Sequence, residues 1–547
     1  MNPSWDTLER SRQARLQRAA PWARGREVAA SDVGELLHAL LEPGDKVCLE
    51  GNNQKQADFL AQALAALDPA RVHDLHMVQS VLSLPSHLDV FERGIASKLD
   101  FSFSGPQSVR LANLVAEGRI QIGAIHTYLE LFGRYFIDLT PRVALVAAQA
   151  ADRHGNLYTG PNTEDTPVIV EATAFGGGIV IAQVNEIVDT LPRVDIPADW
   201  INFVVQAPKP NHIEPLFTRD PAQISEIQVL MAMMAIKGIY AEYGVNRLNH
   251  GIGFDTAAIE LLLPTYAESL GLKGKICQHW ALNPHPALIP AIESGFVKSV
   301  HSFGSELGME KYIAARSDVF FTGADGSMRS NRAFSQTAGL YACDMFIGST
   351  LQIDLQGNSS TATRDRIAGF GGAPNMGSDA RGRRHASDAW IKAGQQAARP
   401  GEIPRGRKLV VQMVETFREH MAPAFVERLD AWELAERADM PLPPVMIYGD
   451  DVSHVLTEEG IANLLLCRSP EEREQAIRGV SGYTAVGLGR DRAMVENLRD
   501  RGVIRRPDDL GISVRDASRD LLAARSVKDL VRWSGGLYDP PKRFRNW

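Results

Sequence analysis

A motif that occurs twice is the strongest constraint that this sequence places on its fold. The pattern Asp-x-x-Gly-Asn ends an apolar run at 152–156 ("VALVAAQAADRHGN") and again at 354–358 ("FIGSTLQIDLQGN"). A Phe-Gly-Gly follows each copy, at 175–177 and at 370–372. Two elements that recur in the same order predict two structurally related halves.

Short β-branched runs alternate with amphipathic stretches along the chain. "KVCLE" (46–50), "VIVEA" (168–172) and "IVIAQV" (179–184) have the length and composition of strands, whereas "KQADFLAQALAAL" (55–67) has helical periodicity. Strands and helices in alternation indicate parallel sheets covered by helices. We therefore predict an α/β protein made of two α/β/α halves with mostly parallel sheets.

A proline-rich stretch offers the best boundary between the halves. The chain has 547 residues, which is more than one hydrophobic core normally covers. The segment "APKPNHIEPLFTRDPAQ" occupies 207–223. We predict an N-terminal domain over 1–223 and a C-terminal domain over 224–547. Ligands of open α/β sheets bind where strand ends meet loops, so a crevice between the halves is the expected site.

Composition excludes several classes of partner. The net charge is −8, from 58 basic and 66 acidic residues, so the surface as a whole offers no electrostatic footprint for nucleic acid. No apolar run approaches the roughly 18 residues of a membrane helix. The 4 cysteines have no paired spacing, and the chain start lacks the apolar core of a signal peptide. These features favour a reducing cytoplasm over a disulfide framework or a zinc site.

Sequence signatures of several enzyme classes are missing. There is no GxxxxGK[ST] of a nucleoside triphosphatase and no GxSxG of an α/β-hydrolase. "NRLNHGIGFDTAAIELLL" places Gly251 and Gly253 ahead of a helix, which favours a bound carboxylate or phosphate, but it lacks the third glycine of a dinucleotide fingerprint. "QHWALNPH" contributes His279 and His285, but their spacing does not place them on one helical face and no carboxylate cluster completes a metal site. We predict no bound metal.

A glycine-rich segment, "IAGFGGAPNMGSDARGRRHASD", occupies 367–388. Glycine permits positive φ and close approach, so its main-chain N–H groups can meet an anion; a surface loop after a strand is the alternative. Arg381, Arg383 and Arg384 follow closely. They are candidates for contact with an anionic partner, or they are solvated loop charges.

The segment "DVSHVLTEEGIANLL" (451–465) resembles the C-terminal signature of the acyl-CoA:carboxylate CoA-transferases and of citrate lyase α subunits. Over essentially the whole chain, the blocks at 49–61, 279–295, 321–358 and 526–541 resemble the α subunits of malonate decarboxylase. The resemblance implies two CoA-transferase-like halves. It also implies transfer of an acyl carrier protein from acetyl to malonyl, in a complex with the carrier and with decarboxylase β and γ subunits. This chain would bind no cofactor of its own and would act on the carrier's phosphoribosyl-dephospho-CoA group.

That chemistry suggests roles for the motifs already described. Tetrahedral anionic intermediates need preorganised N–H donors, which we assign to Gly371 and Gly372, with Asn358 as a further catalytic candidate. Malonate needs polar and cationic contacts. The candidates are Arg329, Ser330, Asn331, Arg332, Gly251, Gly253, His279 and Asn283, and a structural ion pair is the alternative for either arginine. The carrier would meet Arg381, Arg383 and Arg384.

The sequence departs from the CoA-transferases at their nucleophile. Their "H-[ST]-E" segment aligns with "QHWALNPH", which contains no acid. We therefore favour direct attack of malonate on the acetyl thioester, with Glu306 as an alternative nucleophile. Two other functions remain open: a citrate lyase-type or stand-alone CoA-transferase, and a scaffold that only docks the carrier.

Overall fold

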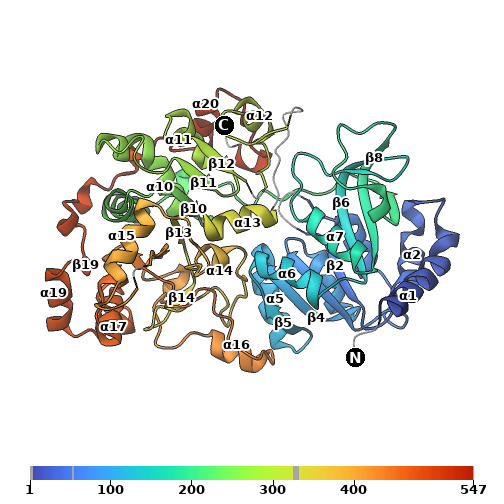
Figure 1. Ribbon diagram of the computed structural model, residues 1–547, viewed down its shortest axis with the longest axis horizontal. Coiled ribbons are helices and arrows are strands. Elements are labelled where there is room, and N and C mark those ends of the chain that lie inside the picture. The colour runs from blue at the N-terminus through green and yellow to red at the C-terminus, as the bar shows by residue number, and fades with distance from the viewer. Residues whose placement is uncertain (1–3, 52–54, 303, 324–331, 404, 546) are drawn as a thin grey trace.

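Two sheets, one from each half of the chain, organise the fold of this computed structural model (Figure 1). The structure describes residues 4–51, 55–302, 304–323, 332–403, 405–545 and 547. The first sheet has the order β1-β9-β8-β6-β2-β3-β4-β5, with β7 added antiparallel to β6 and the other neighbours parallel. Its strands are β1 (Glu27–Val28), β2 (Lys46–Leu49), β3 (Leu75–Val81), β4 (Ala96–Phe103), β5 (Gln121–Ile125), β6 (Val143–Asp152), β7 (Leu157–Tyr158), β8 (Ile179–Val188) and β9 (Phe203–Gln206).

The second sheet has the order β12-β11-β10-β13-β16-β17-β18-β19. It is parallel from β12 to β17, and β18 and β19 are antiparallel to their neighbours. A separate hairpin joins β14 to β15. The strands are β10 (Arg247–His250), β11 (His279–Ala281), β12 (Ser299–His301), β13 (Met345–Gly348), β14 (Gln352–Ile353), β15 (Ser359–Ser360), β16 (Leu409–Met413), β17 (His454–Thr457), β18 (Gly460–Asn463) and β19 (Ile504–Arg505). The predicted mostly parallel α/β architecture is confirmed.

Helices cover the sheets and connect successive strands. In the first half they are α1 (Trp5–Ala19), α2 (Val33–Leu40), α3 (Asp58–Ala65), α4 (Ser86–Glu92), α5 (Ser108–Ala116), α6 (Tyr128–Ile137) and α7 (Thr166–Phe175). In the second half they are α8 (Glu226–Ala235), α9 (Ala241–Tyr243), α10 (Phe254–Leu262), α11 (Ile289–Glu293), α12 (Glu310–Ala315), α13 (Arg332–Tyr341), α14 (Ala373–Met376), α15 (Asp388–Ala397), α16 (Ala431–Arg437), α17 (Pro470–Gly479), α18 (Ala485–Leu488), α19 (Arg492–Asp500) and α20 (Val527–Trp533).

Strand β6 shows how the first sheet is buried on both faces. Its side chains point alternately to opposite faces, as the pleat of a strand requires. Leu145 joins the core that includes Leu36 of α2, whereas Val146 joins a second core with Phe132 of α6 and Ile169 of α7. Burial on both faces explains why the strand reads as a continuous apolar run.

One expected strand is a helix. "VIVEA" (168–172) lies inside α7, whose N-cap is Asp165 and whose first turn contains Pro167. Proline is well suited to that position because its φ is already helical and a first-turn N–H has no partner to lose. The helix-start signal formed by Asp165 and Pro167 therefore outweighed the β-branched composition of the run.

The repeated Asp-x-x-Gly-Asn motif forms the same turn in both halves. In the β6–β7 turn, the Asp152 carboxylate accepts from the main-chain and side-chain nitrogens of Asn156, at 2.9 and 2.8 Å. In the β14–β15 turn, Asp354 accepts from both nitrogens of Asn358, each at 2.9 Å. The fourth motif residue is a glycine with positive φ each time, +91° at Gly155 and +87° at Gly357.

The Phe-Gly-Gly part of the repeat is wrong, because the first copy ends α7 whereas the second precedes α14. The true counterpart of Gly371-Gly372 is Glu164-Asp165. In each pair the first residue has positive φ (+58° and +47°), the second is the helix N-cap, and a proline follows in the first helical turn. Glycine takes this conformation readily, whereas a side chain there costs about 1–2 kcal/mol.

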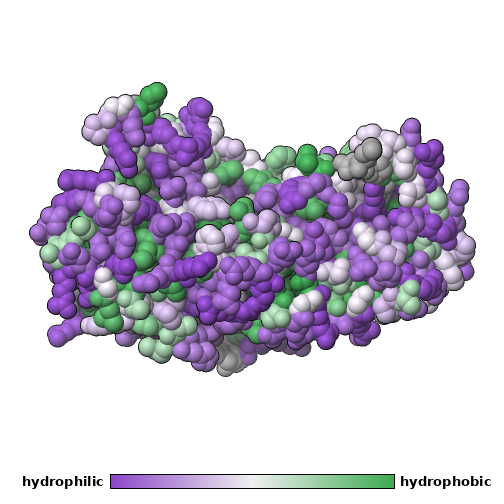
Figure 2. Space-filling view, turned by 90° about the horizontal axis from the view of Figure 1, so that it is seen from below, coloured by the Kyte–Doolittle hydropathy of each residue, from purple (hydrophilic) through white to green (hydrophobic). Residues whose placement is uncertain are grey.

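The face in Figure 2 is mostly hydrophilic, with hydrophobic residues in small separate patches. No helix among the described residues is long and apolar enough to cross a bilayer.

Candidate active site

A cavity of about 580 Å³ lies between the two halves. The second half lines it at the carboxyl ends of β10, β11 and β13, through His250, Asn283 and Gly348. The first half contributes residues such as Phe103, at the end of β4, and Tyr128, at the start of α6. The position matches the crevice expected at the strand ends of open α/β sheets.

The glycine-rich segment forms one wall of this cavity and also joins the halves. Its main chain pairs with the first half: Ser104 N–H donates to the Ala368 carbonyl at 2.9 Å, and Ile367 N–H donates to Ser108 at 3.0 Å. Phe370 and Gly371 N–H groups both donate to the Ser102 carbonyl, at 2.6 and 2.9 Å. The segment is therefore a structural bridge as well as a cavity wall.

The two predicted oxyanion donors differ in this structure. Gly371 is bonded on both sides, because its N–H donates to Ser102 and its carbonyl accepts from Tyr128 N–H at 3.0 Å. Gly372 also lines the cavity, and the described residues place no acceptor on its N–H. The expectation of two available donors is thus corrected to one, the N–H of Gly372.

Gly372 is closely packed against Gln336 of α13. A Cβ atom added to Gly372 would lie 2.7 Å from the Gln336 Oε1 atom and 2.8 Å from its Nε2 atom. The Gln336 side chain is held in turn by Asn375, whose Nδ2 donates to Oε1 at 2.8 Å. Only glycine fits at this position without moving these groups.

Arg332 lines the cavity but is committed to an ion-pair network. Its guanidinium contacts the Glu164 carboxylate and lies 2.7 Å from Asp165 Oδ1, and all three side chains are buried. Its Cζ atom also lies 4.8 Å from the centre of the Tyr128 ring. Burial raises the pKa of Glu164 to about 7, against the charge of Arg332. Of the alternatives for Arg332, the structure shows the ion pair.

A buried carboxylate joins the end of β10 to the loop that follows β11. Glu260 of α10 contacts His250 Nδ1 at 2.9 Å and His285 Nε2 at 2.6 Å. Tyr240 and the Asn283 carbonyl contact the outer nitrogens of the two imidazoles, at 2.8 and 2.9 Å. This arrangement holds His250 and Asn283 in the cavity wall.

The charges in this cluster follow from the same contacts. Burial alone would raise the pKa of Glu260, but the charge of His285 and the two hydrogen bonds lower it to about 2. Burial opposes protonation of His285, yet Glu260 outweighs it and raises the pKa of His285. Burial lowers the pKa of His250. The cluster is best described as one ion pair with a neutral second imidazole.

The remaining predicted polar contacts divide between the cavity and other places. Gly251 and Asn283 line the cavity, and the buried Oδ1 atom of Asn283 has no partner among the described residues. Gly253 is the N-cap of α10 and does not appear in the cavity lining. His279 begins β11, at the end opposite the cavity, where it is exposed and contacts Ser299 at 2.8 Å. His279 is thus not placed to contact a ligand in the cavity.

Glu306 is buried behind the cavity wall. Its Oε1 atom accepts from the main-chain N–H and the hydroxyl of Thr218, at 3.1 and 2.9 Å, whereas Oε2 has no partner among the described residues. Burial raises the pKa of Glu306 to about 7, although the Thr218 hydrogen bonds oppose this shift. Glu306 does not appear among the residues that line the cavity.

Two other groups of predicted residues lie away from the cavity. The Asn358 amide belongs to the β14–β15 turn, where its Oδ1 accepts from Gly449 at 2.8 Å. Arg383 is buried, and its guanidinium donates to Cys343, Asp344 and His385. Arg383 is therefore not available to a carrier, whereas Arg381 and Arg384 are exposed. Arg329, Ser330 and Asn331 lie outside the described residues.

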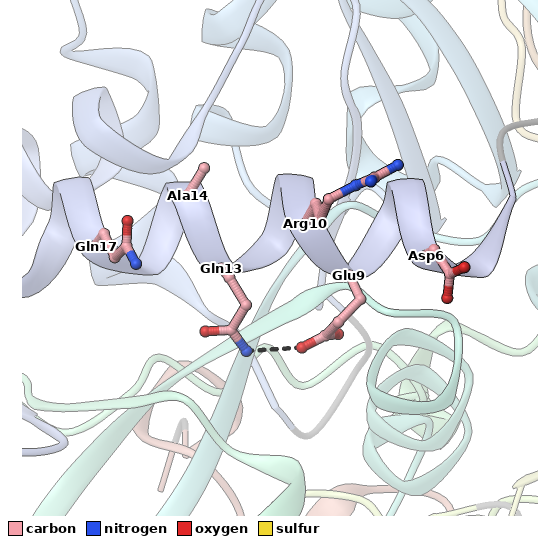
Figure 3. Close-up of a pocket in the computed structure, with 6 residues that line it drawn as sticks. All are labelled: Asp6, Glu9, Arg10, Gln13, Ala14 and Gln17. Atoms are coloured by element: carbon pink, nitrogen blue, oxygen red, sulfur yellow. Dashed lines mark hydrogen bonds between the residues drawn. The ribbon is translucent and has the colours of Figure 1, made fainter.

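A second, shallow hollow lies on the outer face of α1 (Figure 3). Every side chain that lines it comes from this one helix, and Gln13 donates to Glu9 at 2.6 Å. In Figure 3 Arg10 and Ala14 point to the opposite side of the helix from Gln13 and Glu9, so the side chains do not converge on a ligand. Among the described residues no group of His, Cys, Asp or Glu side chains is arranged to hold a metal ion.

Comparison with known proteins identifies the family of this chain. The family model described as "Malonate decarboxylase, alpha subunit, transporter" matches residues 4–547. The chain belongs to the malonate decarboxylase α subunit family. It is 62% identical over 548 residues to the acetyl-S-ACP:malonate ACP transferase of Malonomonas rubra, covering 99% of each chain.

Solved structures support the same family and the wider fold. A chain in the crystal structure of a Pseudomonas malonate decarboxylase hetero-tetramer in complex with malonate has a TM-score of 0.96 and 61% identity, with 100% of both chains covered. An acyl-CoA transferase of Escherichia coli O157:H7 has a TM-score of 0.51 and 14% identity, covering 81% of this chain and 89% of that one. At that identity the similarity concerns the fold alone, and the predicted CoA-transferase-like architecture is confirmed.

Two residues that line the cavity, Tyr128 and Arg219, and the buried Glu260, which does not line it, were not predicted as site residues. Tyr128 gave no signal, because an aromatic residue at a helix start is ordinary. Glu260 did give a sequence signal, because it is an acid within the apolar run "AAIELLL". Arg219 also lines the cavity, although it lies in the segment predicted to be a linker.

Proposed function

We propose that this α subunit family member exchanges acetyl for malonyl on the thiol of an acyl carrier protein, releasing acetate. The single observation that carries the proposal is the cavity between the halves. Its volume is that of a small-molecule site, and Gly372, whose N–H has no acceptor among the described residues, lines one wall. The activity named for the relative from Malonomonas rubra requires such a site.

The proposed exchange has two acyl transfers. A malonate carboxylate oxygen attacks the acetyl thioester carbon, the tetrahedral alkoxide collapses, and the C–S bond breaks to release the carrier thiolate. The thiolate then attacks the malonyl carbon of the mixed anhydride, and the bond to the bridging oxygen breaks to release acetate. No net proton or electron is gained or lost.

The chain's own groups favour these steps by placement and by electrostatics. The Gly372 N–H would donate to the transient alkoxide, a contact worth about 3 kcal/mol in comparable sites. Holding anhydride and thiolate in one water-poor cavity would make the second transfer effectively unimolecular. Glu260 contacts both His250 and His285, and we call these contacts the Glu260 bridge. The bridge keeps His250 and Asn283 in position along the wall.

The carrier and the other subunits are part of the proposal. The carrier's phosphoribosyl-dephospho-CoA group bears several phosphates, and exposed Arg381 and Arg384 would attract it. This chain would supply no cofactor. The decarboxylase β and γ subunits would consume the malonyl carrier.

Release of labelled acetate tests the proposal against its alternatives. The isolated chain, given acetyl carrier protein and malonate, should release acetate, whereas a docking scaffold would release none. Citrate in place of malonate, or acetyl-CoA in place of the acetyl carrier, should give little release. Rapid release with either one would favour a citrate lyase-type or stand-alone CoA-transferase function.

A further inference from the structure

Arg219 occupies an unusual electrostatic position. It lines the cavity, and its Nη1 atom donates to the carbonyls of Leu216 and Thr218, at 2.8 and 3.3 Å. Its Cζ atom lies 5.6 Å from the centre of the Phe254 ring. This guanidinium is partly buried, and among the described residues no carboxylate lies within ion-pair distance of it. Burial lowers the pKa of Arg219, and the more distant charge of Glu306 opposes that shift.

The other arginines that line the cavity in the described part of the chain are already paired. Arg332 contacts Glu164 and Asp165, and Arg366 lies 3.7 Å from a carboxylate oxygen of Glu419. Arg219 therefore has the greatest capacity to bind a new anion, and its neighbours leave the Nη2 and Nε groups without an acceptor in the described chain.

A second group that lines the cavity also lacks a partner. The buried Oδ1 atom of Asn283 accepts no hydrogen bond from the described residues, and the two ends of an amide are interchangeable by rotation. Asn283 is held in place because its carbonyl contacts His285 of the Glu260 bridge. A fixed amide and an unpaired guanidinium on one cavity are a combination suited to a carboxylate.

We propose that Arg219 binds the non-reacting carboxylate of the substrate and thereby selects dicarboxylates over monocarboxylates. This inference rests on the proposed function, in which one carboxylate of malonate reacts and the other keeps its charge. A carboxylate that enters the cavity loses part of its hydration, which costs free energy unless a charged partner replaces the water. A guanidinium that donates two hydrogen bonds to the carboxylate offsets that cost. Acetate, the product, has no second carboxylate and would leave freely. The segment that connects the halves thus supplies a specificity residue.

The sharpest test uses malonamate, which replaces one carboxylate of malonate by a neutral amide of similar shape. The wild-type chain should prefer malonate over malonamate by about a hundredfold in kcat/KM. Arg219→Gln should lower kcat/KM for malonate by about a hundredfold and change it for malonamate by no more than about threefold. Arg219→Lys should recover part of the preference, because it restores charge without the planar fork.

Arg543→Gln is the matched control. Arg543 lies beside the same segment, where it donates to Glu214 and Pro215, but it is exposed and outside the cavity lining. This variant should keep the wild-type preference. Equal losses with malonate and malonamate in Arg219→Gln would indicate a structural role and overturn the inference, as would an unchanged preference.

Calorimetric binding of malonate separates this inference from the proposed function. Malonate should bind the wild-type chain and Arg543→Gln, and Arg219→Gln should bind it about a hundredfold more weakly. If the wild-type chain released no acetate but this difference in binding persisted, the proposed reaction would fail and the carboxylate site would stand. If acetate release persisted and the two variants bound malonate equally, only the inference about Arg219 would fail.

Discussion

Gly372→Ala should slow acyl exchange without preventing folding. The φ of Gly372 is −87°, which alanine adopts without strain, but the new Cβ would lie 2.7 Å from Gln336 Oε1. Either the buried Gln336 side chain or the main chain at 370–373 must shift by several tenths of an ångström. A displaced oxyanion donor typically costs about a hundredfold in kcat, or about 2.7 kcal/mol.

Gly371→Ala is the matched comparison. Its N–H already donates to Ser102, so the account gives it no oxyanion role. Because the φ of Gly371 is +58°, alanine there should cost about 1–2 kcal/mol of stability. We expect a lower melting temperature with kcat reduced by less than about fivefold.

Acetate release at saturating malonate and carrier measures both variants. A second change, Gln336→Ala, should restore much of the lost rate when combined with Gly372→Ala, because it removes the atoms that the Cβ meets. If Gly372→Ala kept the wild-type kcat, or if Gly371→Ala lost more rate than Gly372→Ala, the assignment of the donor would be refuted.

Three further predictions concern the charged groups. Glu260→Gln should lower the free energy of unfolding at pH 7 by about 3 kcal/mol, because the pKa of Glu260 lies at about 2 rather than 4.5. Urea titrations should show this difference in stability shrinking as the pH falls from 4.5 toward 2. Equal stability of the two proteins at pH 7 would contradict the contacts of Glu260 with His250 and His285. Glu306→Gln should keep the exchange rate within about threefold, with no glutamate trapped by hydroxylamine during turnover, and a trapped Glu306 would establish the covalent route. Replacing Arg381 and Arg384 together by serine should raise the KM for the carrier and flatten its salt dependence at unchanged kcat, and an unaltered KM would remove this contact.

The fold was predictable where the sequence pattern reflected burial. The apolar run of β6 is continuous because both faces of the first sheet are covered, and the repeated turn motif depends on local hydrogen bonds that a short sequence encodes. The run at 168–172 misled because an apolar stretch without clear period fits a buried strand and a buried helix equally well. The proline in the first turn of α7 was the deciding signal.

The site was predictable only in part, because whether a main-chain amide or a guanidinium is free to bind a ligand depends on groups from the other half of the chain. The glycine-rich wall was found from composition, yet which amide stays free depends on where Ser102 of β4 lies. Arg332 was predicted as a malonate contact or a structural ion pair, and its pairing with Glu164 and Asp165 is visible only in the packing between the halves. Arg219 was hidden because a proline-rich connector carries no periodic signal of burial.

The direct route of acyl exchange is tested most directly by following oxygen through a single turnover. With enzyme in excess over acetyl carrier and with malonate labelled by oxygen-18, the account predicts that the first acetate released carries one oxygen from malonate, since malonate itself attacks the acetyl carbon. First-turnover acetate without that label would contradict the account, because the oxygen would then have come from a carboxylate of the chain or from water.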